Sequence, residues 1–295
     1  METVFLIGGS GFIGKNLAQY LSQKYHVHVF DKYIDQPFFT SCPSIETTEL
    51  DLVSQRIPQD VPSPDYIINL ASIVTAERNM SLFDELISSN LKILLNLYER
   101  FKEESSLKLF VQFGSGSEQS PFREEDRECP NSPYALVKQL TTNTSMMLYR
   151  NYGFPIMVVR PGNLFGPLQN KDKFIPYVVG QLRSGLPLNV SPCEQKRDFI
   201  YVDDFSCAIE SLLQNHFKCL GEIVNVSSGE SISLKQIIEH CKAYLHSSSD
   251  VNYGALPYRE NEAMDLKCSI AKLSSITGCN IHFDNEKRLT DYLKQ

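Results

Sequence analysis

The sequence lacks the spacing patterns of metal-binding and disulfide-rich proteins. Its eight cysteines include no Cys-x-x-Cys pair and have no histidine at ligand spacing. We therefore predict reduced, mostly structural thiols and no metal site. No apolar run approaches the roughly 20 residues of a membrane span. The first run, Val4 to Ile7, meets glycine at once and has no basic leader before it. These absences predict a cytoplasmic protein without membrane contact.

Positive charge is also scarce. The chain carries 28 lysines and arginines against 35 acidic residues, a net charge of -7, with no long basic run. Because positive charge dominates phosphate binding, we do not expect nucleic acid as the main partner. A small anionic ligand fits this balance. The 295 residues, 42% of them hydrophobic, suffice for one large or two modest domains.

Apolar runs alternate with helix-period segments through the first half of the chain, which predicts a Rossmann-like doubly wound parallel α/β sheet. The predicted strands are Val4 to Ile7, Val27 to Phe30, Tyr66 to Leu70, Leu109 to Phe113 and Ile156 to Val159. The predicted helices are Phe12 to Lys24, Leu82 to Lys102 and Tyr134 to Asn151, then 174 to 184, 203 to 215, 233 to 246 and 286 to 294. We expect residues 1–166 to form the Rossmann domain, with residues near 197–226 returning to it. Residues 167–295 are expected to form a smaller mixed α/β domain.

A glycine-rich loop joins the first predicted strand to the first helix. Its sequence is Gly8-Gly9-Ser10-Gly11-Phe12-Ile13-Gly14. Such glycines let the backbone approach a pyrophosphate, and the helix N-terminus supplies free N–H groups. Asp31 stands at the next strand exit, 20 residues after Gly11, where a carboxylate binds ribose hydroxyls and repels a 2′-phosphate. The loop and Asp31 predict a dinucleotide site that favours NAD, with NADP as the alternative.

A phenol and an ammonium are spaced as an acid/base pair. Tyr134 and Lys138 are four residues apart and share a helix face, behind Pro133 and a cap at Asn131 or Ser132. A nearby cation lowers the pKa of a tyrosine. The spacing alone is common by chance. However, Ser115 and Ser117 follow a predicted strand, so hydroxyl, phenol and ammonium are expected to converge at the carboxyl edge of the sheet.

Further segments complete a recognisable set. They are Asp51-Leu52, Asn69-Leu70-Ala71-Ser72, Arg160 to Pro167 and Arg197 to Asp204. With these motifs the chain resembles, over nearly its whole length, the extended short-chain dehydrogenase/reductases. The resemblance is to their nucleotide-sugar epimerase, dehydratase and reductase group.

The resemblance implies roles for the catalytic residues. Tyr134 would be the acid/base on a sugar oxygen, and Ser115 would hydrogen-bond the same oxygen. Lys138 would bind the nicotinamide ribose and lower the tyrosine pKa. Asp51 and Leu52 would flank the adenine. The remaining cofactor contacts would come from Leu70, Ala71, Ser72 on the fourth strand, and Pro161.

The resemblance also implies a site for a nucleotide-diphosphate sugar. Arg197 and Arg259 would grip the diphosphate, a task suited to the guanidinium fork, and Glu262 would bind the ribose. The expected substrate contacts further include Ser117, Asn163, Lys173, Phe174 and Ile175. Residues 1–166 would thus be the dinucleotide-binding domain and residues 167–295 the substrate domain. The resemblance implies, in addition, a homodimer formed by the helices near 82–102 and 134–151.

The reaction is left between two possibilities. Ser115-Gly116-Ser117 replaces the Thr-Asp-Glu of the family's dehydratases, which argues against dehydration. The segments Lys173 to Tyr177, Gln195 to Ile200 and Gly254 to Met264 resemble the abequose and paratose synthase branch, so we favour 4-keto-sugar reduction in deoxysugar biosynthesis. An NAD-dependent 4-epimerase is the alternative, favoured by Asp31. A non-catalytic NAD-binding sensor would need no Ser/Tyr/Lys set.

Overall fold

Seven parallel strands form the central sheet of the computed structural model, which describes residues 1–75, 77–118, 130–259, 262–278 and 284–295. Their order across the sheet is β10-β6-β5-β4-β1-β2-β3. Their bounds are β1 Thr3–Ile7, β2 His26–Asp31, β3 Ile45–Glu49, β4 Tyr66–Asn69, β5 Leu109–Phe113, β6 Ile156–Pro161 and β10 Ile223–Val226. Every pairing in this sheet is parallel, which confirms the predicted doubly wound α/β class.

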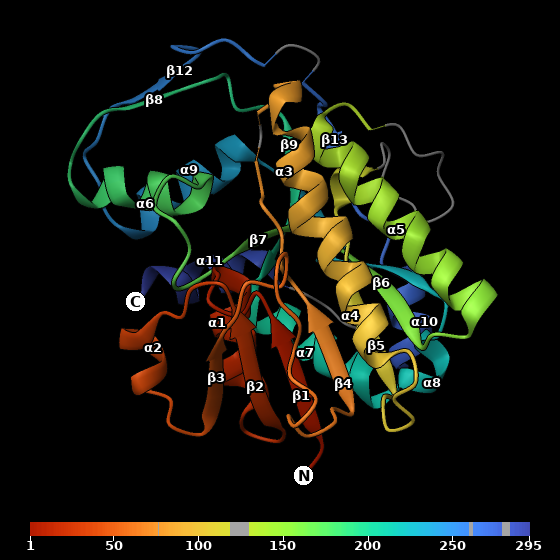
Figure 1. Ribbon diagram of the computed structural model, residues 1–295. Helices are drawn as coiled ribbons and strands as arrows, with labels where there is room; N and C mark the ends of the chain where they lie inside the picture. The colour runs from red at the N-terminus through yellow and green to blue at the C-terminus, as the bar shows by residue number, and fades with distance from the viewer. Residues whose placement is uncertain (76, 119–129, 260–261, 279–283) are drawn as a thin grey trace.

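Helices cover both faces of this sheet (Figure 1). One face packs against α1 (Phe12–Leu21), α7 (Val202–Gln214) and α10 (Ala271–Thr277) through a shared apolar core. A second core joins the opposite face to α4 (Ile93–Phe101) and α5 (Pro133–Tyr152). Strands buried from both sides explain the continuous apolar runs, since each side chain meets a helix layer.

One predicted helix has an internal irregularity. A 3-10 turn (Met80–Leu82) leads into the segment predicted as a single helix. That segment consists of α3 (Phe83–Ile87), a π-helical turn (Ser88–Lys92) and α4. Three short helices were not predicted, namely α2 (Gln36–Thr40), α8 (His216–Cys219) and α10 (Ala271–Thr277).

Other segments of the second half build a smaller layer above the carboxyl ends of the parallel strands (Figure 1). One sheet combines β7 (Asn163–Phe165), β9 (Lys196–Tyr201), β11 (Ser231–Ser233) and β13 (Asp265–Leu266), and β8 (Leu188–Val190) pairs with β12 (Val251–Tyr253). The helices α6 (Phe174–Arg183), α9 (Leu234–Tyr244) and α11 (Asn285–Leu293) share a third apolar core with these strands. The division into two domains stays a prediction.

Asp198 of β9 ties the two parts together. Its buried carboxylate accepts hydrogen bonds from the Ser227 hydroxyl at 2.6 Å, the Gly229 N–H at 3.1 Å and the Cys268 N–H at 3.1 Å. Both the hydroxyl and the N–H of Ser228 donate to it as well. These donors come from the segments that follow β10 and β13, so one carboxylate fixes three pieces of chain. None of the helices among the described residues has the length and hydropathy of a membrane crossing.

Candidate active site

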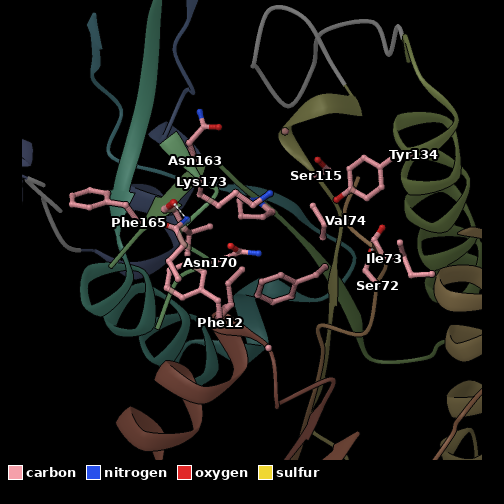
Figure 2. A pocket seen from close by; sticks show the side chains of 18 of the residues that line it. Phe12, Ser72, Ile73, Val74, Ser115, Tyr134, Asn163, Phe165, Asn170 and Lys173 are labelled. Atoms are coloured by element: carbon pink, nitrogen blue, oxygen red, sulfur yellow. Dashed lines mark hydrogen bonds between the residues drawn. The ribbon is translucent and has the colours of Figure 1, made fainter. Parts of the chain in front are cut away.

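A cavity of about 1480 Å³ opens along the carboxyl edge of the parallel sheet. One wall carries Ser72, Ser115 and Tyr134, and the facing wall carries Asn163 and Lys173 (Figure 2). This is the edge at which doubly wound sheets bind ligands. The cavity exceeds the usual volume of a single small-molecule site, about 300–1000 Å³, and is large enough for two ligands.

The glycine loop forms one end of the cavity. Gly8 has a left-handed φ of +77°, and a Cβ there would stand 2.7 Å from the Ala71 nitrogen. A Cβ on Gly14 would stand 2.5 Å from the Gly9 Cα. These two positions therefore require glycine for close backbone packing. Gly11 is the N-cap residue of α1 and provides no side-chain cap, and Gly8, Gly11, Phe12, Ile13 and Gly14 all line the cavity.

Asp31 ends β2 and also lines the cavity. Its Oδ2 accepts a hydrogen bond from the Ser10 backbone N–H at 2.9 Å. The carboxylate therefore braces the glycine loop in addition to its predicted ribose contact. Lys15 forms an ion pair with Asp35 beside it, at 2.8 Å.

The other predicted cofactor residues lie along the same wall. They are Asp51, Leu52, Leu70, Ala71, Ser72 and Pro161. Leu52 is buried in the core and Asp51 closes its own turn by accepting from the Val53 N–H at 3.0 Å. The prediction that Ser72 lies on the fourth strand is wrong. β4 ends at Asn69, and Ser72 follows it, because the backbone leaves the sheet where the cavity begins.

Tyr134 occupies the second position of α5, whose first residue is Pro133. The Ser132 hydroxyl caps the helix by accepting from the Ala135 N–H at 3.2 Å. Burial raises the pKa of Tyr134 to about 12, although hydrogen bonding with the Ser115 and Ser72 side chains opposes the rise. At neutral pH the phenol is thus protonated and can donate a proton.

Lys138 lies one turn further along α5 and is almost fully buried. Its Nζ donates to the Phe113 carbonyl at 2.9 Å and lies 5.9 Å from the centre of the Tyr134 ring. Burial lowers the pKa of Lys138 to about 8. The expectation that this lysine brings the Tyr134 pKa below 10 is wrong for this state of the protein. Burial shifts the two pKa values in opposite directions, because it disfavours the charged form of each group.

A buried ion pair beside these residues was not predicted. Glu118 and Arg160 are 0% and 1% exposed, and an Nη2–Oε2 distance of 2.8 Å joins them. Arg160 begins one of the segments that carry the family resemblance, but no spacing in the sequence links it to Glu118. Asn90, in the π-helical turn, was not predicted to be buried, and it is not among the residues that line the cavity. It is fully buried, and its side-chain N–H group donates to the Leu86 carbonyl at 2.9 Å.

The far wall holds the residues predicted for the substrate. Asn163, Lys173, Phe174 and Ile175 line it, and the Asn163 side chain donates to the Asp198 carbonyl at 3.1 Å. Phe174 and Ile175 begin α6. The side chain of Ser117 lies outside the described part of the chain.

The expected diphosphate and ribose residues contact each other. The Arg197 guanidinium forms an ion pair with Glu262 and also donates to the Ala263 carbonyl at 2.8 Å. Arg259 is exposed at the cavity rim. In this state Glu262 partly neutralises Arg197, so a bound diphosphate would compete with its carboxylate for the guanidinium.

The donor set fits a dinucleotide. The tightly packed glycine loop, the first turn of α1 and the carboxylate of Asp31 line one continuous wall that leads to Ser115, Tyr134 and Lys138. The fold and the site together define a dinucleotide-binding α/β protein with a Ser/Tyr/Lys centre.

Comparisons with known proteins agree with this class. The model of the NAD dependent epimerase/dehydratase family matches residues 4–227, so the chain belongs to that family. It is accordingly an NAD-dependent enzyme of the nucleotide-sugar epimerase, dehydratase and reductase group, which confirms the predicted resemblance and cofactor.

Individual relatives carry different activities. CDP-abequose synthase of Salmonella muenchen is 34% identical over 129 residues, which span only 44% of each chain. The dTDP-4-dehydro-6-deoxyglucose reductase of Escherichia coli is 27% identical over 92% of this chain and 91% of the relative. The structure of UDP-glucuronic acid 4-epimerase from Bacillus cereus, at 23% identity, covers 99% of both chains with a TM-score of 0.89 and so shares the fold.

Proposed function

We propose that this protein is an oxidoreductase that acts at C4 of a nucleotide-diphosphate sugar and reduces a 4-keto group. The observation that carries the proposal is the convergence of Ser115, Tyr134 and Lys138 on the cavity that the glycine loop and Asp31 also line. The names of two relatives, an abequose synthase and a 4-dehydro-sugar reductase, support the reductive direction.

In the proposed reduction, each residue of the site has a distinct role. Tyr134 donates a proton to the sugar O4, and Ser115 orients that oxygen by hydrogen bonding. When bound, the coenzyme supplies the hydride that reduces C4. The pKa of Tyr134, raised to about 12, keeps the phenol protonated, which is the form that a reduction needs. Arg197 and Arg259 bind the diphosphate, and Glu262 binds the ribose once Arg197 has turned to the phosphates.

A 4-epimerase is the second candidate, and Asp31 favours it. The carboxylate of Asp31 selects NAD over NADP, and an epimerase recycles the NAD that it holds. A homodimer and a cytoplasmic location belong to the proposal as well.

The two candidates differ in whether reduced coenzyme is consumed. The purified protein is mixed with reduced coenzyme and, in separate reactions, with CDP- and dTDP-linked 4-keto-6-deoxy sugars, and loss of reduced-nicotinamide absorbance is followed. Stoichiometric oxidation supports the reductase. In a second assay, the purified protein receives UDP-linked 4-hydroxy sugars and no reduced coenzyme, and interconversion of the two C4 epimers with retained NAD supports the epimerase. No change in either assay contradicts both.

A further inference from the structure

Glu118 is fully buried next to the proposed catalytic residues, where a carboxylate needs compensation for its lost hydration. It ends the short turn Gly116–Glu118 that follows β5. Its Oε2 accepts from Arg160 Nε at 3.0 Å and forms the ion pair with Nη2. Arg160 lies on β6, the strand that neighbours β5 in the sheet. The pair therefore anchors the turn to the rigid sheet.

The other carboxylate oxygen holds Ser115 directly. Oε1 accepts from the Ser115 backbone N–H at 2.6 Å, and the Glu118 N–H donates back to the Ser115 carbonyl at 3.2 Å. Gly114 makes room for this contact, because a Cβ there would stand 2.6 Å from Oε1. On the other side, Lys138 donates to the Phe113 carbonyl. The turn that carries Ser115 is thus held by one buried anion and one buried cation.

We propose that Glu118 is a positioning residue. Held by Arg160, it fixes the turn that presents the Ser115 hydroxyl to Tyr134. The inference rests on the proposed function of the site. A positioning role explains why the ion pair of Glu118 and Arg160 is buried here, since a buried ion pair by itself contributes little to stability.

The charge of Glu118 also reaches the other members of the site. It raises the pKa of Tyr134 and that of Lys138. The titratable and charged groups that face it are Arg160 on β6 and Tyr134 and Lys138 on α5. Neutralising Glu118 should therefore lower both pKa values and shift the pH profile of turnover toward lower pH.

A double-mutant cycle with Ser115 tests the positioning role. Glu118→Gln is expected to lower kcat by ~10-fold or more, because a small misplacement of a reacting group is costly, while coenzyme KM stays within about twofold. If Glu118 acts through Ser115, Glu118→Gln combined with Ser115→Ala is no slower than the slower single variant. Losses that multiply in the double variant would overturn the inference.

Glu210 provides a matched control. It is also a buried carboxylate, paired with Lys24 at 2.7 Å, but it lies between α1 and α7 away from the cavity. Glu210→Gln should reduce stability without shifting the pH profile. A Glu118→Gln variant that loses activity only in proportion to its folded fraction, as the control does, contradicts positioning.

Two further experiments keep the inference testable if Glu118→Gln does not fold or if no substrate is found. The variant Glu118→Leu with Arg160→Met leaves no unpaired buried charge, and it should fold, bind NAD and turn over as slowly as Ser115→Ala. Turnover at the wild-type level in this folded variant would overturn the inference.

The second measure needs no sugar. Lysine 13C NMR should show Lys138 titrating near pH 8 in the wild type, with the signal identified by its loss in Lys138→Met. The titration should move to lower pH in Glu118→Gln, and an unmoved titration would contradict the inference. If the wild type turns over no nucleotide sugar, the proposed function fails, while this titration still tests whether the buried carboxylate of Glu118 acts on the site.

Discussion

At the scale of single residues, burial governs the proposed catalytic groups more than their mutual contact does. The phenol of Tyr134 and the ammonium of Lys138 share a helix face, yet desolvation raises the pKa of the first to about 12 and lowers that of the second to about 8. Around neutral pH both groups are therefore protonated, and a modest rise in pH neutralises the lysine first.

Lys138 makes stability depend on pH. Between pH 8 and 10 its amine is largely deprotonated in the folded protein but protonated in the unfolded chain, whose lysines have a pKa of 10.5. The unfolded state then binds more protons, so the free energy of unfolding rises with pH. Relative to Lys138→Met, the wild type should gain ~1–3 kcal/mol across this window, at about 1.4 kcal/mol per pKa unit. Urea unfolding of both proteins at each pH measures the difference, and parallel curves would contradict the burial of a charged lysine.

Tyr134→Phe removes the proposed proton donor and little else. We expect turnover to fall by at least ~100-fold, the low end for general acid catalysis, with coenzyme affinity unchanged. Steady-state kinetics and coenzyme titration check this. Near-normal turnover in a folded variant would rule out the proposed role of the phenol.

At the scale of elements, two glycines that both lie within helices should change stability in opposite directions when replaced by alanine. In Gly14→Ala the new Cβ would collide with the Gly9 backbone at 2.5 Å, so the variant should lose ~1–3 kcal/mol of stability and weaken NAD binding. Gly180 is in the exposed middle of α6 with nothing within 4 Å of an added methyl group, so Gly180→Ala should gain ~0.5–1 kcal/mol. Denaturant unfolding measures both, and equal effects would contradict the tight packing of the loop.

Much of the first half was predictable because its elements carry local signals. The five predicted strands occur within two residues of their predicted ends, since continuous apolar runs mark strands that are covered on both faces. β3 was not predicted, because Ile45–Glu49 carries only one fully buried apolar side chain at the edge of the sheet. The π-helical turn has no such signal, because it changes hydrogen bonding without changing the apolar pattern.

The site was predictable to the same extent. Motif residues such as Tyr134 and Lys138 were found from their spacing, and they line the same cavity as the glycine loop. Glu118 and Arg160 were not found as a pair, because 42 residues separate them and only strand pairing brings them together. The ion pair of Arg197 with Glu262 was equally hidden, since it depends on how two segments of the second half meet.

At the scale of the whole molecule, the proposed homodimer makes α4 and α5 its contact surface. Leu95 and Leu140 are 39% and 38% exposed on these helices, so a charge at Leu140 would have to be buried in the dimer. Leu140→Asp should therefore convert a dimer into monomers, measured by light scattering after gel filtration.

Phe217→Asp is the control for this experiment. Phe217 is 64% exposed on α8, which packs with α7 on the opposite face of the sheet, so its charge should leave the mass unchanged. A monomeric wild type, or a Leu140→Asp variant that remains dimeric, would contradict this interface.

The return of β10 to the first sheet has a consequence for the nascent chain during translation. β10 pairs with β6 at the edge of the parallel sheet, although β7, β8 and β9 of the upper layer come between them in sequence. Until residue 226 has left the ribosome, β6 exposes an unpaired backbone edge, the kind of surface that invites aggregation. Translation must therefore continue well past the glycine loop before the sheet that carries this loop is complete. A fragment that ends at residue 166 would leave the edge of β6 unpaired permanently.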